Sequence, residues 1–220
     1  MQSFPQSDFF ITGCDSNTEW QLKWFLKNYQ KHNKTPIVVA DFGMTPNMRA
    51  WTYQVSGAHM IEVPRQRVNG WFLKPKTMQM TGEGRRCWLD TDIHVLGDIS
   101  GIFDHIEENK IGMVEDRPWS KRRGETWHNS GVIAMQGQPT ILNDWVKACM
   151  TTPNQGDQEV LHEILRESPL KRMTHITSLP NIYNWLRIQL LDGEDSPDKL
   201  CMHWTGMKGN MQIERLMYND

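Results

Sequence analysis

Two acidic residues stand one residue apart in WLDTDIHVLGDISGIF, residues 88–103. An apolar run leads directly into Asp90-Thr91-Asp92, and further apolar residues follow. In a strand, alternate side chains share a face, so Asp90 and Asp92 would point the same way. Two such carboxylates repel each other unless a cation or hydrogen bonds offset their charge. Their oxygens suit Mg²⁺ or Mn²⁺, and the alternative is a solvated acidic turn.

Three polar groups later in the chain could act together with this pair. Asn129 opens the apolar run NSGVIAM, and Asp157 and Gln158 open DQEVLHEIL, which has helical spacing. His203 ends an apolar run and is followed by Lys208 in HWTGMKG. Each group also has a structural explanation. Asn-Ser-Gly is common in turns, an acid at a helix start is favoured by the helix dipole, and a lone His is often a core residue.

These motifs, with DISGIFDHI after the acidic pair, occur in a defined order along the chain. In that order the sequence resembles the nucleotide-sugar glycosyltransferases of the GT-A fold. Within them it is most similar to glycosyltransferase family 8, with its glycogenin-like and lipopolysaccharide galactosyltransferase-like enzymes. That family has an apolar-Asp-x-Asp strand, an xDIxxLF helix, an Asn-Ser-Gly strand, an Asp-Gln helix start and a late His-x-x-Gly loop with a Lys. The resemblance covers about residues 8–209.

The resemblance implies one GT-A domain over residues 1–220, with an α/β fold whose central sheet is mainly parallel and flanked by helices. It implies a metal-dependent transferase that uses a nucleotide-diphosphate sugar, by default a UDP-sugar, and a carbohydrate, lipid or protein acceptor. Transfer would retain the anomeric configuration. The leaving phosphate would take the acceptor proton, because no clear catalytic base is visible. The sugar, the acceptor and the oligomeric state are left open.

The resemblance also assigns the metal and the donor phosphates to particular residues. Asp90, Asp92 and His203 would hold Mn²⁺ or Mg²⁺, with Asp92 as the firmer ligand and Asp90 also facing the donor ribose. Lys208 would meet the donor phosphates, although it stands five residues after the His where the family usually has six. Departure of a pyrophosphate group needs positive charge already in place, which a metal ion and a lysine can supply.

Five further residues would bind the rest of the donor. Asp157 would bind sugar hydroxyls, Gln158 would lie near the anomeric carbon, and Asn129 would lie under the sugar. Asp15, at the end of the first predicted strand, would contact the nucleoside, unless its side chain forms an Asx turn. Lys74, which precedes the acidic pair by 16 residues, would reach the donor or else lie in solvent.

The ten tryptophans include two groups with different predicted roles. Four lie in patterns typical of a core, namely Trp20, Trp24, Trp88 and Trp145. Three lie in loop-like segments and could form a platform for stacking against sugar rings, namely Trp119, Trp127 and Trp185. Acceptor choice would then depend on the loops 116–128 and 180–199.

Alternating strands and helices must position these residues, which predicts a layered α/β sheet. The predicted strands are 9–14, 36–42, 60–63, 86–96, 111–115 and 130–135. The predicted helices are 18–31, 45–55, 71–80 (with Pro75 near its start), 99–107, 139–150 and 157–166. Ligands in such sheets bind beyond the carboxyl ends of the strands, and both Asp15 and the acidic pair follow strand ends.

Composition restricts the class of protein. The 24 Lys and Arg against 26 Asp and Glu give a net charge of −2, which argues against nucleic acid or an anionic membrane as main partner. Lys121-Arg122-Arg123 is interpreted as a solvated loop. Four cysteines without a CxxC pair favour free thiols in a reducing compartment. No signal-peptide pattern or membrane-spanning apolar stretch is present, so we expect a soluble cytoplasmic protein.

Two other functions remain open at this stage. Haloacid dehalogenase-like phosphohydrolases also use an apolar-Asp-x-Asp strand, but they place it near the chain start, and here three predicted strands precede it. A degenerate transferase could bind a sugar nucleotide without turnover. Release of free nucleoside diphosphate would identify the transferase, and release of inorganic phosphate would identify the hydrolase.

Overall fold

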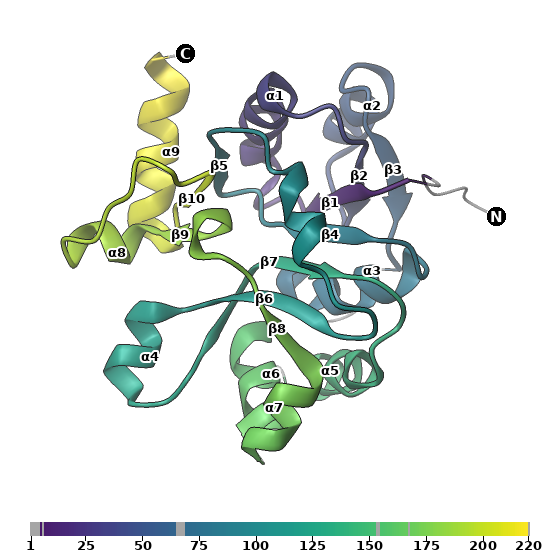
Figure 1. Ribbon diagram of the computed structural model, residues 1–220. Coiled ribbons are helices and arrows are strands. Elements are labelled where there is room, and N and C mark those ends of the chain that lie inside the picture. The colour runs from purple at the N-terminus through teal and green to yellow at the C-terminus, as the bar shows by residue number, and fades with distance from the viewer. Residues whose placement is uncertain (1–4, 6, 65–68, 153–154, 167, 220) are drawn as a thin grey trace.

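Strands and helices alternate along the chain in the computed structural model of the protein (Figure 1). The structure describes residues 5, 7–64, 69–152, 155–166 and 168–219. The first four residues, on which the expected lack of a signal peptide partly rests, lie outside this set. The strands are β1 (Phe9–Cys14), β2 (Ile37–Asp41), β3 (His59–Glu62), β4 (Arg86–Leu89), β5 (Ile93–Val95), β6 (Ile111–Glu115), β7 (His128–Met135), β8 (Ile176–Ser178), β9 (Trp185–Leu186) and β10 (Cys201–His203).

Helices connect and cover the strands. Helix α2 begins as its sequence predicts, because Thr45 accepts a hydrogen bond from the Met48 N–H at 3.3 Å and Pro46 occupies the first turn. Pro75 likewise lies in the first turn of α3. The helices are α1 (Leu22–His32), α2 (Pro46–Gln54), α3 (Lys74–Met80), α4 (Arg117–Arg123), α5 (Thr140–Thr151), α6 (Asp157–Arg166), α7 (Pro169–His175), α8 (Arg187–Leu191) and α9 (Gly206–Asn219).

The large sheet has seven strands in the order β3-β2-β1-β4-β7-β6-β8. Strand β7 runs antiparallel to its neighbours β4 and β6, and the other neighbouring pairs of this sheet are parallel. The predicted α/β fold with a mainly parallel central sheet is therefore confirmed. Parallel strands end at the same edge, so the carboxyl ends of β1, β2 and β4 lie together on one side of the molecule.

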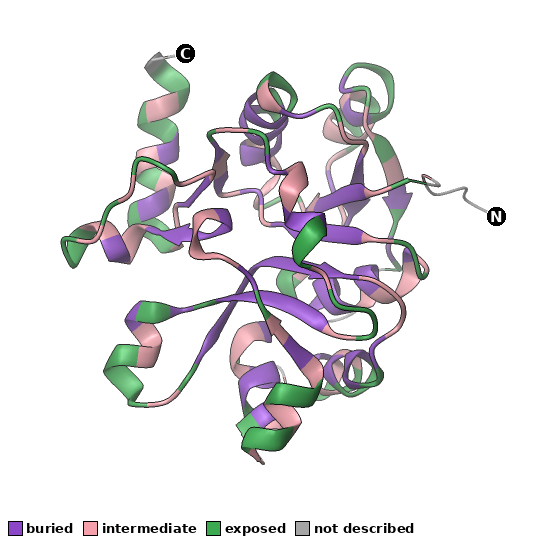
Figure 2. Ribbon diagram, viewed as in Figure 1, coloured by how far each residue is buried: buried purple, intermediate pink, exposed green. Residues whose placement is uncertain are grey.

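Both faces of this sheet are covered by apolar side chains, as expected when helices pack on both sides. Phe10 and Val39 belong to one core cluster, which includes α1 residues. Ile11 and Val38 belong to the other, which includes residues of α3, α5 and α6. Figure 2 shows the result, with buried strands at the centre and exposed surface on the outer sides of the helices.

A second sheet of three strands, in the order β5-β10-β9, brings the end of the chain back to the acidic pair. Strand β10 is antiparallel to β5, and their register places His203 opposite Ile93. Ile93 directly follows Asp92 in the sequence. This pairing therefore places His203 beside the acidic residues, although more than a hundred residues separate them in the sequence.

The prediction of one continuous strand over 86–96 is wrong. β4 ends at Leu89, a turn contains Asp90 and Asp92, and β5 begins at Ile93. The Ile93 N–H donates to the Asp90 carbonyl at 3.2 Å, which closes the turn. The strand breaks here because β5 leaves the large sheet to pair with β10.

Several predicted helices differ in type or extent. The segments 18–31 and 71–80 each begin with a 3-10 helix (Glu19–Gln21 and Gly70–Leu73), and 99–107 contains only the 3-10 helix Ser100–His105. The basic cluster 121–123 is exposed as predicted, but it forms the last turn of α4 instead of a loop. A fourth 3-10 helix covers Asn181–Tyr183.

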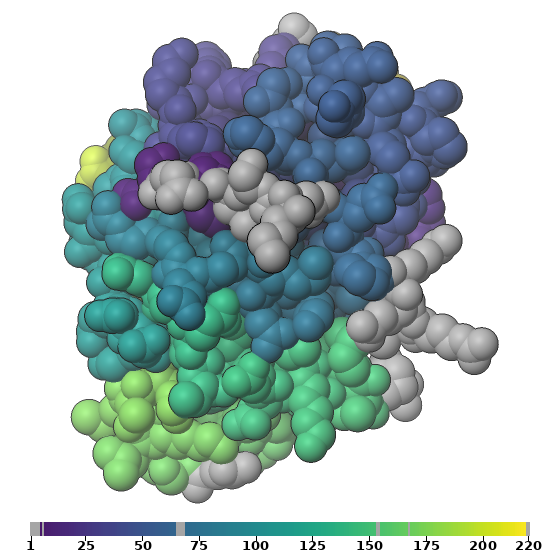
Figure 3. All heavy atoms as spheres, turned by 90° about the vertical axis from the view of Figure 1, so that its right-hand side faces the viewer, coloured from purple at the N-terminus to yellow at the C-terminus, as the bar shows by residue number. Residues whose placement is uncertain are grey.

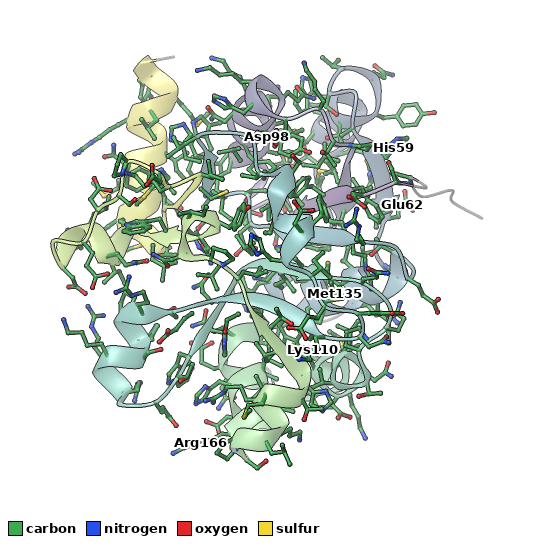
Figure 4. The ribbon with its side chains drawn as sticks, in the orientation of Figure 1. His59, Glu62, Asp98, Lys110, Met135 and Arg166 are labelled. Atoms are coloured by element: carbon green, nitrogen blue, oxygen red, sulfur yellow. The ribbon has the colours of Figure 1, made fainter. Side chains whose placement is uncertain are left out.

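Polar residues mark the outer surface of the fold. His59 and Glu62 are exposed on the edge strand β3, where polar side chains discourage pairing with another chain (Figure 4). Figure 3 views the side at which β1 begins, with the N-terminal part of the chain above the green middle part.

No helix among the described residues is long and apolar enough to cross a membrane. The four cysteines are buried free thiols.

Candidate functional site

Asp90, Asp92 and His203 meet where β4 ends and β10 ends. The Asp90 N–H donates to the Gly131 carbonyl of β7 at 2.9 Å, and the Trp204 N–H donates to the Asp92 carbonyl at 3.0 Å. These bonds hold the acidic turn between the two sheets. The three side chains offer ligand atoms that all lie within 4.8 Å of one another. The sequence predicted this grouping, although the carboxylates converge through a turn and not through one strand face.

Lys74 is the cation that balances the acidic turn. Its side chain is 3% exposed, and Nζ lies 3.2 Å from Asp90 Oδ1 and 3.1 Å from Asp157 Oδ2. It also donates to the Ser130 carbonyl at 3.1 Å. Burial lowers the pKa of Lys74, but the two carboxylates outweigh burial and raise it, so the ammonium stays charged. The alternative of a solvated lysine is therefore wrong.

Asp90 is held from a second direction by Trp88, whose Nε1 donates to Asp90 Oδ1 at 2.6 Å. The indole in turn stacks on Phe42, with ring centroids 5.9 Å apart. Burial raises the pKa of Asp90, Lys74 lowers it and Asp92 raises it, with a net upward shift. The carboxylate charge of Asp90 is thus only partly compensated, which favours a further cation beside it.

His203 is buried, and its two ring nitrogens have different partners. Nε2 lies 3.1 Å from Asp92 Oδ1, and Nδ1 lies 2.9 Å from Asn184 Oδ1. Burial lowers the pKa of His203, but the charge of Asp92 and the hydrogen bond to it outweigh burial and raise it. The ring rests on Gly131, where an added Cβ would come within 2.2 Å of His203 Cε1. Only glycine permits this approach.

The donor set fits Mn²⁺ or Mg²⁺. Two carboxylates supply the oxygen ligands that these hard ions prefer, and the imidazole adds one nitrogen ligand. Asp92 Oδ1 is buried, and the polar atom that the structure places beside it is His203 Nε2. When His203 carries its proton on Nδ1, Nε2 presents a lone pair to that oxygen at 3.1 Å. Two such atoms at this distance need a cation or a proton between them.

Two hollows meet at this cluster. The larger has a volume of about 490 Å³ and is lined by residues after β1 and β2, including Asp15 and Phe42. The smaller has a volume of about 300 Å³ and is lined by Asn129, Asp157 and Gln158, among others. Both hollows are lined by the same five residues, Trp71, Lys74, Asp90, Asp92 and Gly206. A ligand that filled both would therefore pass directly over the acidic turn.

Asn129 and Gln158 form one network with Asp116 beneath the smaller hollow. Asn129 Nδ2 donates to Asp116 Oδ2 at 3.2 Å and to Gln158 Oε1 at 3.0 Å. Gln158 Nε2 donates to Asp116 Oδ2 at 3.1 Å. Asn129 lies within β7 and not in the turn that its Asn-Ser-Gly context allowed. The contacts of Asp157 and Gln158 with a sugar, and the place of Asn129 under it, remain predictions.

Asp15 has the alternative role that its sequence allowed. Its Oδ1 accepts hydrogen bonds from the N–H groups of Asn17 at 2.9 Å and Thr18 at 3.1 Å, which is an Asx turn. Its Oδ2 accepts from Asn17 Nδ2 at 3.3 Å. Because Asp15 also lines the larger hollow, a contact with a nucleoside remains a prediction.

Lys208 lies apart from the acidic cluster. It is exposed in the first turn of α9, which begins at Gly206 with a φ of 72°. The predicted loop after His203 is therefore mostly a helix start. Neither hollow is lined by Lys208, whereas both are lined by Lys74. A phosphate contact of Lys208 remains a prediction, and Lys74 is the better placed cation.

The predicted tryptophan platform is mostly wrong. Trp127 and Trp185 are 8% and 7% exposed, and Trp127 stacks on His162 with ring centroids 3.5 Å apart. Trp119 alone of the three lines the smaller hollow. Trp71, which is 49% exposed, lines both hollows, and the buried Trp88 lines the larger one. The four predicted core tryptophans are buried or half-buried in the core, namely Trp20, Trp24, Trp88 and Trp145.

Three residues of the site were missed in the sequence, namely Trp71, Asp116 and Asn184. Asp116 directly follows β6, so the strand-end reasoning that identified Asp90 could have identified it. Trp71 stands three residues before Lys74, the residue that was predicted to reach the donor, so its position beside that lysine was the available signal. Asn184 carries no local signal, because its partners are 19 and 55 residues away.

Comparison with known proteins supports the fold. No family model matches the sequence, and no curated protein is significantly similar to it. The galactosyltransferase LgtC, solved with donor and acceptor sugar analogs, superposes with a TM-score of 0.65 at 13% identity, covering 96% of this chain and 94% of that chain. The glycosyltransferase GlyE of Streptococcus pneumoniae TIGR4 superposes with a TM-score of 0.66 at 15% identity, covering 98% of this chain and 64% of that chain. The chain therefore has the GT-A-type fold of the glycosyltransferases.

Proposed function

We propose that this chain is a metal-dependent glycosyltransferase that transfers a sugar from a nucleotide-diphosphate sugar to an acceptor. One observation carries the proposal: two hollows meet at the Asp90, Asp92 and His203 cluster, with Lys74 beside it. A nucleotide sugar matches this arrangement, because its diphosphate joins a nucleoside on one side to a sugar on the other. The fold shared with solved glycosyltransferases supports the same reading.

The parts of the donor then have distinct places. The nucleoside, uridine by default, occupies the larger hollow beside Asp15, and the sugar occupies the smaller hollow beside Asp157 and Gln158. Asp90, Asp92 and His203 hold Mn²⁺ or Mg²⁺. When bound, the ion offsets the negative charge that develops on the leaving diphosphate.

This chain's own groups orient the sugar. Gln158 donates one amide hydrogen to Asp116, and its other amide hydrogen is available to a ligand in the smaller hollow. Asp116 and Asp157 are already engaged, the first with Asn129 and the second with Lys74. We therefore propose that the leaving phosphate accepts the acceptor proton and that transfer retains the anomeric configuration.

The acceptor would approach past Trp119, at the rim of the smaller hollow. A carbohydrate, a glycolipid or a glycoprotein could stack a sugar ring there. The four buried free thiols support a reducing compartment, and we propose the cytoplasm.

The test is a panel of nucleotide sugars with and without Mn²⁺, followed by thermal unfolding and by release of nucleoside diphosphate. A donor at 100 times its dissociation constant should add about 2.7 kcal/mol to the free energy of unfolding. Asp92→Asn should unfold like wild type and lose more than about tenfold in turnover, since it removes a ligand charge.

The outcomes separate the alternatives. Turnover that survives chelation, or that Asp92→Asn retains within tenfold, would overturn the metal assignment. Stabilisation without any release of nucleoside diphosphate would indicate a binding protein. Release of inorganic phosphate from a phosphate ester would indicate a hydrolase.

A further inference from the structure

His203 is the last member of a buried chain of hydrogen bonds that begins at Asp116. Asn129 Nδ2 donates to Asp116 Oδ2 at 3.2 Å, Asn184 Nδ2 lies 2.9 Å from Asn129 Oδ1, and His203 Nδ1 lies 2.9 Å from Asn184 Oδ1. Asn184 is 0% exposed, and the other three side chains are at most 7% exposed. Water cannot replace these bonds without opening the core.

The donor and acceptor of each hydrogen bond in this chain follow from Asp116, at which the chain begins. An ionised carboxylate only accepts hydrogen bonds, so Asn129 must present its NH₂ group to Asp116. Asn129 Oδ1 then accepts from the Gly131 N–H at 2.9 Å and from Asn184 Nδ2. Asn184 must therefore present its Oδ1 to His203, and that oxygen can only accept.

Asn129 has no hydrogen-bonding capacity left for a sugar. Its NH₂ group donates to Asp116 and Gln158, and its oxygen accepts from Gly131 and Asn184. An amide side chain offers two donors and two acceptor positions, and all four are used. Its place in the site is therefore beneath Gln158 and behind His203.

We propose that Asp116, Asn129 and Asn184 form a relay that keeps a proton on His203 Nδ1, so that Nε2 is the ring nitrogen whose lone pair binds the metal. This inference rests on the proposed metal site. Asn184 is the positioning residue, because it is the member of the relay that hydrogen-bonds the imidazole ring. Groups that orient a metal-bound histidine in this way commonly contribute 10–100-fold to metal affinity, and we expect about that loss when Asn184 is replaced.

Two substitutions of Asn184 separate the loss of its hydrogen bond to His203 from the effect of changing a buried side chain. Asn184→Leu removes the acceptor, whereas Asn184→Asp keeps an acceptor for Nδ1–H and loses the donor to Asn129. Gln189→Met is the matched control, because Gln189 is also fully buried in this segment, and its side chain bonds Leu186 and Glu194 instead of the relay. Mn²⁺ affinity is measured without donor by titration calorimetry, and the His203 tautomer by ¹⁵N NMR of the ring under mildly alkaline conditions.

We expect Asn184→Leu to lose about 10–100-fold in Mn²⁺ affinity, Asn184→Asp to keep most of it, and the control to match wild type. Nδ1 of wild-type His203 should carry a proton even without metal, because Asn184 Oδ1 can only accept. The relay would be overturned by an unprotonated Nδ1 in wild type, by Asn184→Leu binding within twofold of wild type, or by equal losses in the Leu and Asp variants.

The NMR measurement also separates this inference from the proposed function. If Nδ1 of wild-type His203 is protonated but the protein binds no Mn²⁺, the proposed metal site is wrong while the relay stands. If Asn184→Leu does not fold, Asn184→Asp and the wild-type tautomer still decide the question.

Discussion

Replacing Lys74 by Met should destabilise the protein strongly at neutral pH and less at lower pH. Met keeps the length of the buried stem but removes the ammonium that lies 3.2 Å from Asp90 and 3.1 Å from Asp157. Removing one partner of a buried ion pair leaves the other charge uncompensated, which typically costs about 3–5 kcal/mol. Here one lysine serves two carboxylates, so we expect the upper part of that range.

The pH dependence has a definite sign. The pKa of Asp90 is already raised in the folded protein, chiefly by burial, and Lys74 is the cation that limits the rise. Without Lys74 the folded-state pKa rises further above the unfolded value near 3.8. In the window between those two values the folded state binds more protons than the unfolded state. Stability must therefore fall as pH rises through it, and more steeply in the variant than in wild type.

The assay is urea unfolding of wild type, Lys74→Met and Lys76→Met from pH 5 to pH 8, with and without Mn²⁺. Lys76 is the matched control on the same helix, where its ammonium donates to Gln79, and its loss should change stability by about 0.5 kcal/mol or less. Mn²⁺ should partly restore Lys74→Met, since a cation again balances the carboxylates. A Lys74→Met cost below about 1 kcal/mol, or a deficit that grows as pH falls, would refute this reasoning.

Three further substitutions test the site. Gly131→Ala should weaken Mn²⁺ binding at least about tenfold in calorimetry, because the new methyl group would displace the His203 ring; unchanged affinity would contradict the placement of that ring. Asp157→Asn should slow sugar transfer more than it weakens nucleoside diphosphate binding, whereas a destabilised but fully active variant would indicate that Asp157 acts only at the helix start. Lys208→Ala should weaken binding of the nucleoside diphosphate more than that of the monophosphate. Equal losses would mean that Lys208 does not reach the outer phosphate, and no loss would leave Lys74 as the phosphate cation.

Local sequence patterns determined the elements and their order. Apolar runs of strand length predicted most strands of the large sheet, and the Thr-Pro pair predicted the start of α2. The acidic pair and the order of the later motifs, through the resemblance to a known family, predicted the GT-A fold and the grouping of Asp90, Asp92 and His203. These signals are local because strand alternation, helix periodicity and capping depend on residues within a few positions of one another.

Only the tertiary structure determined which side chains of the site contact one another. No local signal placed a break at Asp90, because the break exists only where β5 pairs with β10, more than a hundred residues later. The sequence could not show whether the Lys74 side chain lies in solvent or in the site. The packing of α3 places it against Asp90 and Asp157. Asn184 and Asp116 join the site through partners 55 and 13 residues away from them. Buried polar groups must find partners wherever the fold brings them, so their pairing is a property of the packed chain and not of any segment.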